Sequence, residues 1–137
     1  METEATKVLR EYLEGAFARK DPAALDATVA PDAIDHAGVP GQPEGIEGFR
    51  LFISFVLAAF PDLDLVVEDC FGVDDRAVAR WTGAATHEGD FLGIPPTHRR
   101  VTMRGMDIVR VRDGRITELW AETDVAGVMQ QLTDPVG

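Results

Sequence analysis

Residues 99–124 read RRVTMRGMDIVRVRDGRITELWAETD, two strand-like runs separated by Asp113 and Gly114. An Asp-Gly pair between two such runs predicts a β-hairpin, because both residues tolerate the positive φ angles of a tight turn. Each run is longer than the usual strand of about five or six residues. A strand of that length in a small domain bends or carries a bulge, so this stretch predicts a long, curved antiparallel hairpin.

The segments before the hairpin supply further strands and two long helices. Strand-like runs lie at 63–71 and 76–89, and a helical pattern over 46–60 ends at Pro61. This helix is apolar nearly all round, which predicts burial on more than one side. The first helix is predicted from apolar residues that recur on one stripe, at Val8, Leu9, Tyr12, Leu13, Ala16 and Phe17.

Three short elements complete the chain. Asp21 and Pro22 supply an N-cap and a first-turn proline for a second helix. A short strand is predicted at 33–36 inside a Pro- and Gly-rich loop, and a closing helix at 125–132. Helices followed by an antiparallel meander predict an α+β fold of one domain, residues 1–137. It is a cone-shaped barrel with N-terminal helices packed on a strongly bent antiparallel sheet, and its hollow suits a small molecule.

Composition narrows the class of protein. A formal charge of −11 disfavours nucleic acid or an anionic membrane surface as a partner. No apolar run reaches about 18 residues and the first residues show no signal-peptide pattern, so a cytoplasmic protein without a membrane span is predicted. The single cysteine excludes an internal disulfide, and the three histidines lack the spacing of a metal site, so no metal is expected.

Four stretches carry a family pattern: DHAGVPGQPEGIEGF at 35–49, AAFPDLDL at 58–65, DDRAVARWTGAATHEGDFLGIPPTHRRV at 74–101 and GMDIVRVRDGRITELWAETDVAGVMQQL at 105–132. They resemble the SnoaL-like polyketide cyclase family, within the nuclear-transport-factor-2-like superfamily of cone folds. The resemblance implies a homodimer or homotetramer with an enclosed pocket that needs no cofactor. For catalytic members it implies an intramolecular aldol ring closure driven by an acid/base aspartate.

The resemblance assigns two catalytic candidates. Asp124 matches the position of the family's aspartate, and His36 matches a pocket histidine. Asp124 also directly precedes the closing helix, where an aspartate often serves as the N-cap, and the two roles are compatible. His36 follows a short strand in a loop, where a histidine is often only a surface residue.

The register of the hairpin decides which side chain accompanies Asp124. With a two-residue turn, Asp107 lies opposite Trp120 and shares the face of Asp124. With a three-residue loop and a bulge, Met106 lies opposite Trp120 and Arg110 joins that face. Both hairpins are ordinary, so Asp107 and Arg110 are competing candidates for contact with a substrate.

Other candidate substrate contacts are single polar residues and large apolar side chains. Ser54 is the polar residue of an otherwise apolar helix, although such a serine can simply bond back to a backbone carbonyl. His87 lies in the THEG stretch, where it can line a pocket entrance. The side chains suited to a flat ligand include Phe17, Trp81, Met106 and Trp120, although a plain core needs the same types.

The leading hypothesis is a cofactor-free aldol cyclase that acts on a small apolar, carbonyl-rich molecule. An apolar pocket raises the pKa of a carboxyl toward neutrality, so Asp124 beside Trp120 can act as a base, with His36 or Arg110 as donor to the enolate. The alternatives are a cofactor-free hydroxylase, isomerase or epoxide hydrolase, and a non-catalytic ligand-binding or dimerisation module. Apolar residues on both faces of the hairpin predict a dimer through the outer face.

Overall fold

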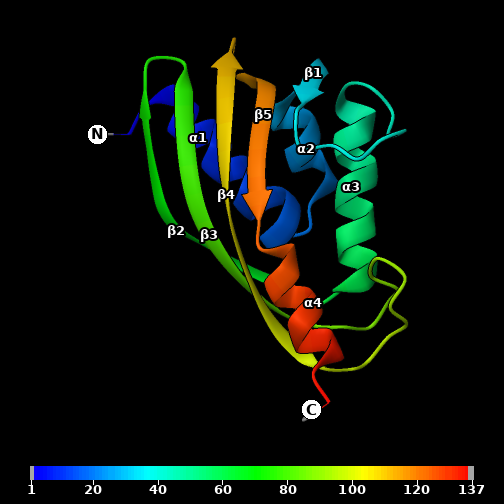
Figure 1. Ribbon diagram of the computed structural model, residues 1–137. Coiled ribbons are helices and arrows are strands. Elements are labelled where there is room, and N and C mark those ends of the chain that lie inside the picture. The colour runs from blue at the N-terminus through cyan, green and yellow to red at the C-terminus, as the bar shows by residue number, and fades with distance from the viewer. Residues whose placement is uncertain (1, 136–137) are drawn as a thin grey trace.

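Five strands form one strongly bent sheet in the computed structural model, which describes residues 2–135 (Figure 1). Their order across the sheet is β1-β5-β4-β3-β2. The strands are β1 (Val29–Asp35), β2 (Asp64–Val73), β3 (Arg76–Thr86), β4 (Arg100–Arg112) and β5 (Arg115–Thr123). Because β2, β3, β4 and β5 pair antiparallel in chain order, the predicted meander is confirmed.

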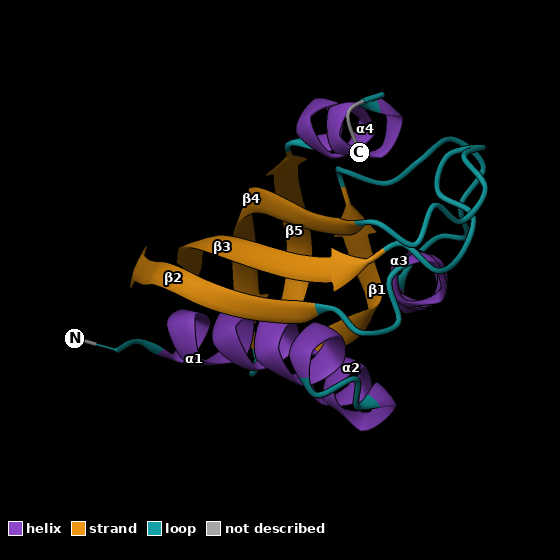
Figure 2. Ribbon diagram, turned by 90° about the horizontal axis from the view of Figure 1, so that it is seen from below, coloured by secondary structure: helices purple, strands orange, loops and turns teal. Residues whose placement is uncertain are grey.

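Helices flank this sheet at the positions that the sequence predicts. They are α1 (Glu4–Glu11), its π-helical continuation η1 (Tyr12–Ala18), α2 (Pro22–Thr28), α3 (Ile46–Ala59) and α4 (Val125–Thr133). Figure 2 shows α1 and α2 on one face of the sheet, α3 beside β1 and α4 at the end of β5. The α+β fold with N-terminal helices on a bent sheet is therefore confirmed. No helix within 2–135 is long and apolar enough to cross a membrane.

One strand pair departs from the antiparallel expectation. β1 runs parallel to β5, with Ile34 beside Glu118 and Asp35 beside Leu119. The sequence predicts only a short strand within a loop here, because parallel pairing depends on how α2 carries the chain back across the sheet. The sheet is therefore mixed, and the parallel pair brings the end of β1 next to the middle of β5.

The hairpin of β4 and β5 has a register that differs from both predictions. Its turn is the two-residue Asp-Gly turn, with positive φ angles of 52° and 76°. A bulge after the first two pairs then shifts the register by one residue, so Arg110 pairs with Glu118 and Ile108 with Trp120. A two-residue turn and a bulge occur together here, whereas the sequence predicts them as alternatives.

Period-two alternation divides β4 between the two faces of the sheet. Asp107 and Val109 are buried on the inner face, at 7% and 0% exposure. Met106 and Ile108 point outward, at 53% and 40% exposure. The inner face therefore carries the carboxyl of Asp107, and the outer face carries an apolar surface.

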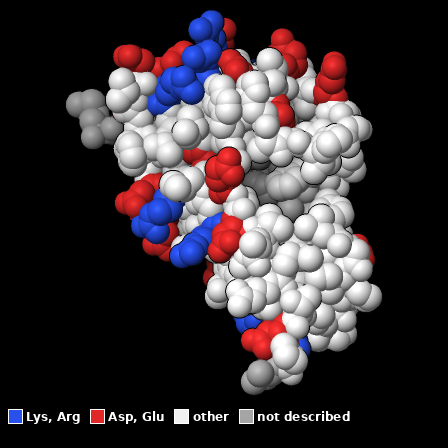
Figure 3. Space-filling view, viewed as in Figure 1, with Lys and Arg blue, Asp and Glu red and all other residues white. Residues whose placement is uncertain are grey.

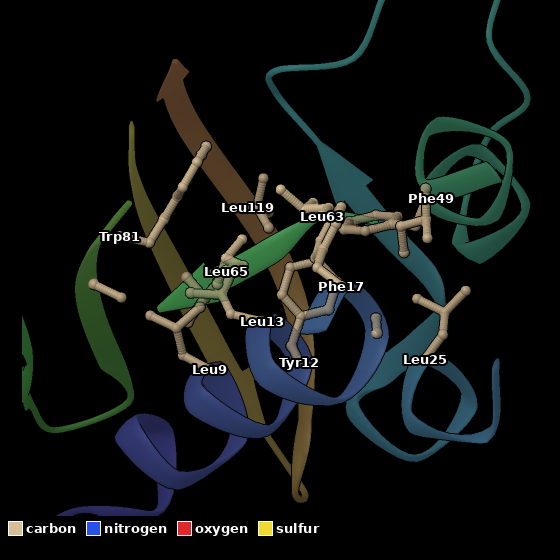
Figure 4. Packing of buried hydrophobic residues seen from close by; sticks show 14 of the residues in the cluster. Leu9, Tyr12, Leu13, Phe17, Leu25, Phe49, Leu63, Leu65, Trp81 and Leu119 are labelled. Carbon is tan, nitrogen blue, oxygen red and sulfur yellow. The ribbon is translucent and has the colours of Figure 1, made fainter. Parts of the chain in front are cut away.

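The hydrophobic core lies between the inner face of the sheet and the helices α1, η1 and α3. Figure 4 shows Tyr12 and Phe17 from η1 reaching toward the strands, with Phe49 of α3 on the other side. Tyr12 makes edge-to-face contacts with Phe17 and Phe49, at ring-centroid distances of 5.8 and 6.2 Å. Trp81 and Leu119 close this core from the sheet.

The prediction that the third helix is buried on more than one side is wrong. Leu51, Phe52 and Phe55 are 53%, 41% and 42% exposed. Only one stripe of α3, including Phe49 and Ile53, packs inward, because the described chain places no second layer outside this helix. The apolar composition of α3 therefore leaves an exposed apolar surface.

Candidate active site

Asp107 is the carboxyl that the fold places within the apolar inner face. Its Oδ1 accepts a hydrogen bond of 3.0 Å from the indole N–H of Trp81. The ring of Trp81 fits against β4 because residue 105 is glycine: a Cβ there would lie 2.6 Å from the indole Cζ2. Within residues 2–135, Oδ2 of Asp107 accepts no hydrogen bond from another residue.

The environment of Asp107 poises its carboxyl for proton transfer. Its pKa is raised from 3.8 to about 6, mainly because burial disfavours the charged form. The hydrogen bond from Trp81 acts in the opposite direction, and the nearby charge of Asp35 adds to the rise. A carboxyl with a pKa near the working pH can accept a proton and return it in one cycle.

Two further ionisable groups face the same interior. Burial, together with the charges of Asp107 and Asp35, holds the pKa of the Tyr12 phenol well above its usual value of 10.0. Tyr12 therefore keeps its hydroxyl proton and can donate a hydrogen bond. Asp35 stands at the end of β1, beside Leu119 of β5 and on the same face of the sheet.

The loop after β1 holds Asp35 in place. Its Oδ1 accepts from the backbone N–H of Ala37 at 2.9 Å, and its Oδ2 accepts from the amide of Gln42 at 3.1 Å. A groove of about 410 Å³ runs between β1 and this loop, and Asp35 forms part of its wall. The surface is also hollowed between β5 and α3 (Figure 3). Asp35 thus lies in the wall of a surface groove and also contributes to the raised pKa of Asp107.

Several predicted site residues gather instead on the outer face of the sheet. His36 stacks on Trp120 with ring centroids 4.7 Å apart and planes 9° apart, and its Nε2 lies 2.9 Å from Glu118. Arg110 donates to the other oxygen of Glu118 at 3.0 Å. The hydrogen bond with His36, followed by the charge of Arg110, lowers the pKa of Glu118. Arg76 lies over the Trp120 ring at 4.8 Å.

This arrangement corrects the predicted partnership of His36 with Asp124. His36 and Asp124 do not point into a shared enclosed cavity. The bulge in β5 and the parallel pairing of β1 turn His36 and Trp120 outward. Met106 and Arg110 share that outward face, so their predicted contacts with a ligand inside the cone are not supported by the fold. Asp107 is the competing candidate that the structure brings inside.

Asp124 is the N-cap of α4. Its Oδ1 accepts the backbone N–H of Gly127 at 2.9 Å, and its Oδ2 lies 3.6 Å from Arg104. The side chain is 41% exposed, so it lacks the apolar enclosure that raises the pKa of Asp107. The capping role is therefore confirmed, whereas a catalytic role for Asp124 stays a prediction.

The other predicted contacts divide between the interior and the surface. Phe17, Trp81 and His87 are buried in the interior, so His87 does not lie at an open pocket entrance, and contact of the three with a substrate stays a prediction. Ser54 is exposed on α3, where its hydroxyl donates to the carbonyl of Leu51 at 2.8 Å. Its predicted place inside the cavity is wrong, because α3 turns the stripe with Phe49 inward and Ser54 outward.

The sequence pattern does not predict Tyr12 and Asp35 as site residues. Tyr12 was included only in the apolar stripe of the first helix, although a tyrosine on such a stripe carries a polar hydroxyl that needs a partner. Asp35 directly precedes His36, and period-two alternation shows that only one of them can face the interior. The alternation of Asp35 and His36 can be seen in the sequence. The sequence does not show which of the two residues faces the interior.

Comparisons with known proteins agree on one family. The sequence profile of SnoaL-like polyketide cyclases matches residues 6–132. A curated relative is nogalonic acid methyl ester cyclase from Streptomyces nogalater, 27% identical over 117 residues, which are 81% of this chain and 84% of the relative. The structure of TsrD from Streptomyces laurentii has a TM-score of 0.87 and 32% identity, covering 97% of this chain and 98% of TsrD. IdmH from Streptomyces antibioticus, named as a candidate polyketide cyclase, has a TM-score of 0.81 and 34% identity, covering 95% and 99%.

Proposed function

The chain belongs to the SnoaL-like polyketide cyclase family, and on this basis we propose that it closes a ring in a carbonyl-rich small molecule by intramolecular aldol addition, without a cofactor. The observation that carries the proposal is the inward-facing carboxyl of Asp107. It lies in an apolar face, has one oxygen held by Trp81 and has a pKa raised to about 6. We propose Asp107 as the acid/base residue in preference to Asp124.

The proposed reaction balances without any further reactant. Oδ2 of Asp107 takes a proton from a carbon flanked by two carbonyl groups, which leaves an enolate. The enolate carbon attacks another carbonyl carbon of the same molecule, so one C–C bond forms and a C=O becomes an alkoxide. The proton on Asp107 then passes to the alkoxide, and the carboxylate is restored.

Tyr12 is the proposed donor to the developing negative charge. Its raised pKa keeps the phenol protonated, and the side chain is buried in the core that packs on the inner face of the sheet. A donor fixed in an apolar site stabilises an enolate or alkoxide more strongly than water does. The apolar core around Tyr12 and Trp81 would also hold a flexible chain in the folded shape that ring closure needs.

Turnover of nogalonic acid methyl ester, the compound in the name of the curated relative, tests the proposal. We expect the protein to convert it to a cyclised isomer of the same mass, separated by chromatography. Because the base must be ionised, kcat/KM should rise with pH through about 6 and then level off. A rate that is flat between about pH 5 and pH 8 would argue against a base with this pKa.

We further propose that the functional unit is a homodimer formed through the outer face of the sheet. An apolar row crosses this face through cross-strand neighbours, from Phe71 through Val78 and Ile108 to Trp120. Acidic and basic residues flank the row, including Glu118 and Glu122 of β5 and Arg76, Arg80 and Arg110 of β3 and β4. A two-fold axis through the row would bury it against the same row of the second copy.

Replacing Ile108 with glutamate should separate the dimer. A buried carboxylate in the centre of an apolar interface is costly, whereas on the free outer face it would be solvated. We expect light scattering at micromolar concentration to give twice the 14.9 kDa chain mass for the wild type and the chain mass for Ile108→Glu. Thr123→Glu, at an exposed position of the same hairpin away from the row, is the matched control. A wild type that is monomeric in this measurement contradicts the dimer.

A further inference from the structure

One buried polar group on the inner face lacks a partner. His87 extends β3 beyond its last residue, since its backbone N–H donates to the carbonyl of Arg99 and its carbonyl accepts from His98, both at 2.9 Å. Period-two alternation puts His87 on the same face as Trp81 and Ala85. Its side chain is 0% exposed, and its Nε2 forms no hydrogen bond within the described chain.

The hydrogen bonds of the ring fix its tautomer. The backbone N–H of Thr97 donates to Nδ1 of His87 at 3.1 Å, and the Thr97 hydroxyl lies 3.0 Å from the same atom. In a neutral imidazole a nitrogen that accepts from an N–H carries no hydrogen, so the hydrogen is on Nε2. The unpartnered atom is therefore an N–H donor, and Thr97 fixes the direction in which it points.

A buried N–H group without a hydrogen-bond acceptor is unusual in a folded protein. Nearly all buried polar groups are hydrogen-bonded, because leaving one unpaired costs its full desolvation. The neighbouring groups are aromatic: the Phe60 ring lies 5.7 Å from the His87 ring, and Phe91 lies 5.2 Å from Phe60. The Phe60 and Phe91 rings offer this donor no oxygen or nitrogen acceptor.

We propose that Nε2–H of His87 binds an oxygen atom of the substrate, a ketone or quinone carbonyl or a phenol oxygen, at the end of the inner face remote from Asp107. The inference rests on the proposed function. Asp107 pairs with Ala79, eight residues before His87, so the two positions are about 26 Å apart along the strand and closer through its bend. A substrate that reaches both groups must then extend along the inner face of the sheet, with its acidic carbon near one end and the acceptor near the other.

The kinetic test compares wild type, His87→Phe and Thr97→Val with nogalonic acid methyl ester as the probe. His87→Phe keeps a flat ring but removes the donor, so we expect KM to rise about 10- to 100-fold with kcat within about threefold. Thr97→Val removes only the hydroxyl, and its backbone N–H still fixes the tautomer, so KM should change less than about threefold. An unchanged KM in His87→Phe, or an equal rise in Thr97→Val, overturns the inference.

A spectroscopic measurement decides the matter if His87→Phe does not fold. In the chain with Asp107→Asn, which should bind the probe without turning it over, the ¹⁵N-bound proton at Nε2 of His87 should shift when the probe is added to saturation. No shift means that the donor serves a buried water or no ligand, and the inference fails. If the probe binds and causes this shift, but wild type does not turn it over, the proposed reaction is refuted and the binding role of His87 is kept. Absence of any binding by wild type refutes both.

Discussion

Asp107→Asn should lower turnover of nogalonic acid methyl ester by about 10²- to 10⁴-fold, the usual contribution of a positioned acid/base group. Asparagine has nearly the same shape, and its side-chain oxygen can still accept the hydrogen bond from the Trp81 indole. It cannot take up a proton, so only the chemistry is removed. The measurement is kcat by single-turnover kinetics, with circular dichroism to show that the fold is kept.

Asp124→Asn is the matched control for this substitution. Asparagine is as good an N-cap as aspartate, so α4 and the hydrogen bond to Gly127 should survive. If Asp107 is the base, Asp124→Asn keeps turnover within a few-fold of wild type. The reverse result, an active Asp107→Asn and an inactive Asp124→Asn, would assign the chemistry to the residue that the family position suggests.

The second large effect is a pH dependence of the free energy of unfolding that Asp107 causes. The pKa of Asp107 rises from 3.8 to about 6 on folding, so the folded state holds its proton more tightly than the unfolded state does. This contribution to stability is present in full below pH 3.8 and is lost as the pH rises through about 6. At about 1.36 kcal/mol per pKa unit, the loss is about 3 kcal/mol.

Asp107→Asn removes this pH dependence because asparagine does not ionise. We therefore compare the free energies of unfolding of the variant and of wild type. The variant's value minus the wild-type value should increase by about 3 kcal/mol, nearly the whole loss, between about pH 4 and about pH 7. Subtracting the wild-type value removes the pH dependence that other titrating groups contribute equally to both proteins. Urea unfolding followed by circular dichroism measures it, with Asp124→Asn as the control. A difference that is constant with pH would show that Asp107 is solvated.

Together the two measurements separate function from structure at one residue. A catalytic carboxyl in an apolar site reduces stability at neutral pH, so its removal should cost activity and improve stability. A purely structural Asp107 would show the opposite pair of results, namely unchanged turnover and a less stable variant.

Much of the fold follows from local patterns in the sequence. The Asp-Gly pair predicts the turn between β4 and β5, and Asp21 with Pro22 predicts the start of α2. Asp124 is likewise recognisable as a cap because it directly precedes the helix. These features depend on the hydrogen bonds and dihedral angles of neighbouring residues, which the sequence specifies directly.

The faces of the strands depended on contacts between distant segments. One bulge in β5 sets the register of the hairpin, and with it Glu118, Trp120 and Glu122 lie on the face opposite to Asp107. A one-residue shift reverses every side chain of a strand, and nothing in the local pattern locates such a bulge. The parallel pairing of β1 likewise turns Asp35 inward and His36 outward. The sequence by itself determined the elements, the family and a carboxyl-rich last strand, and only the tertiary structure decided which carboxyl is enclosed, because burial results from packing between elements far apart in the chain.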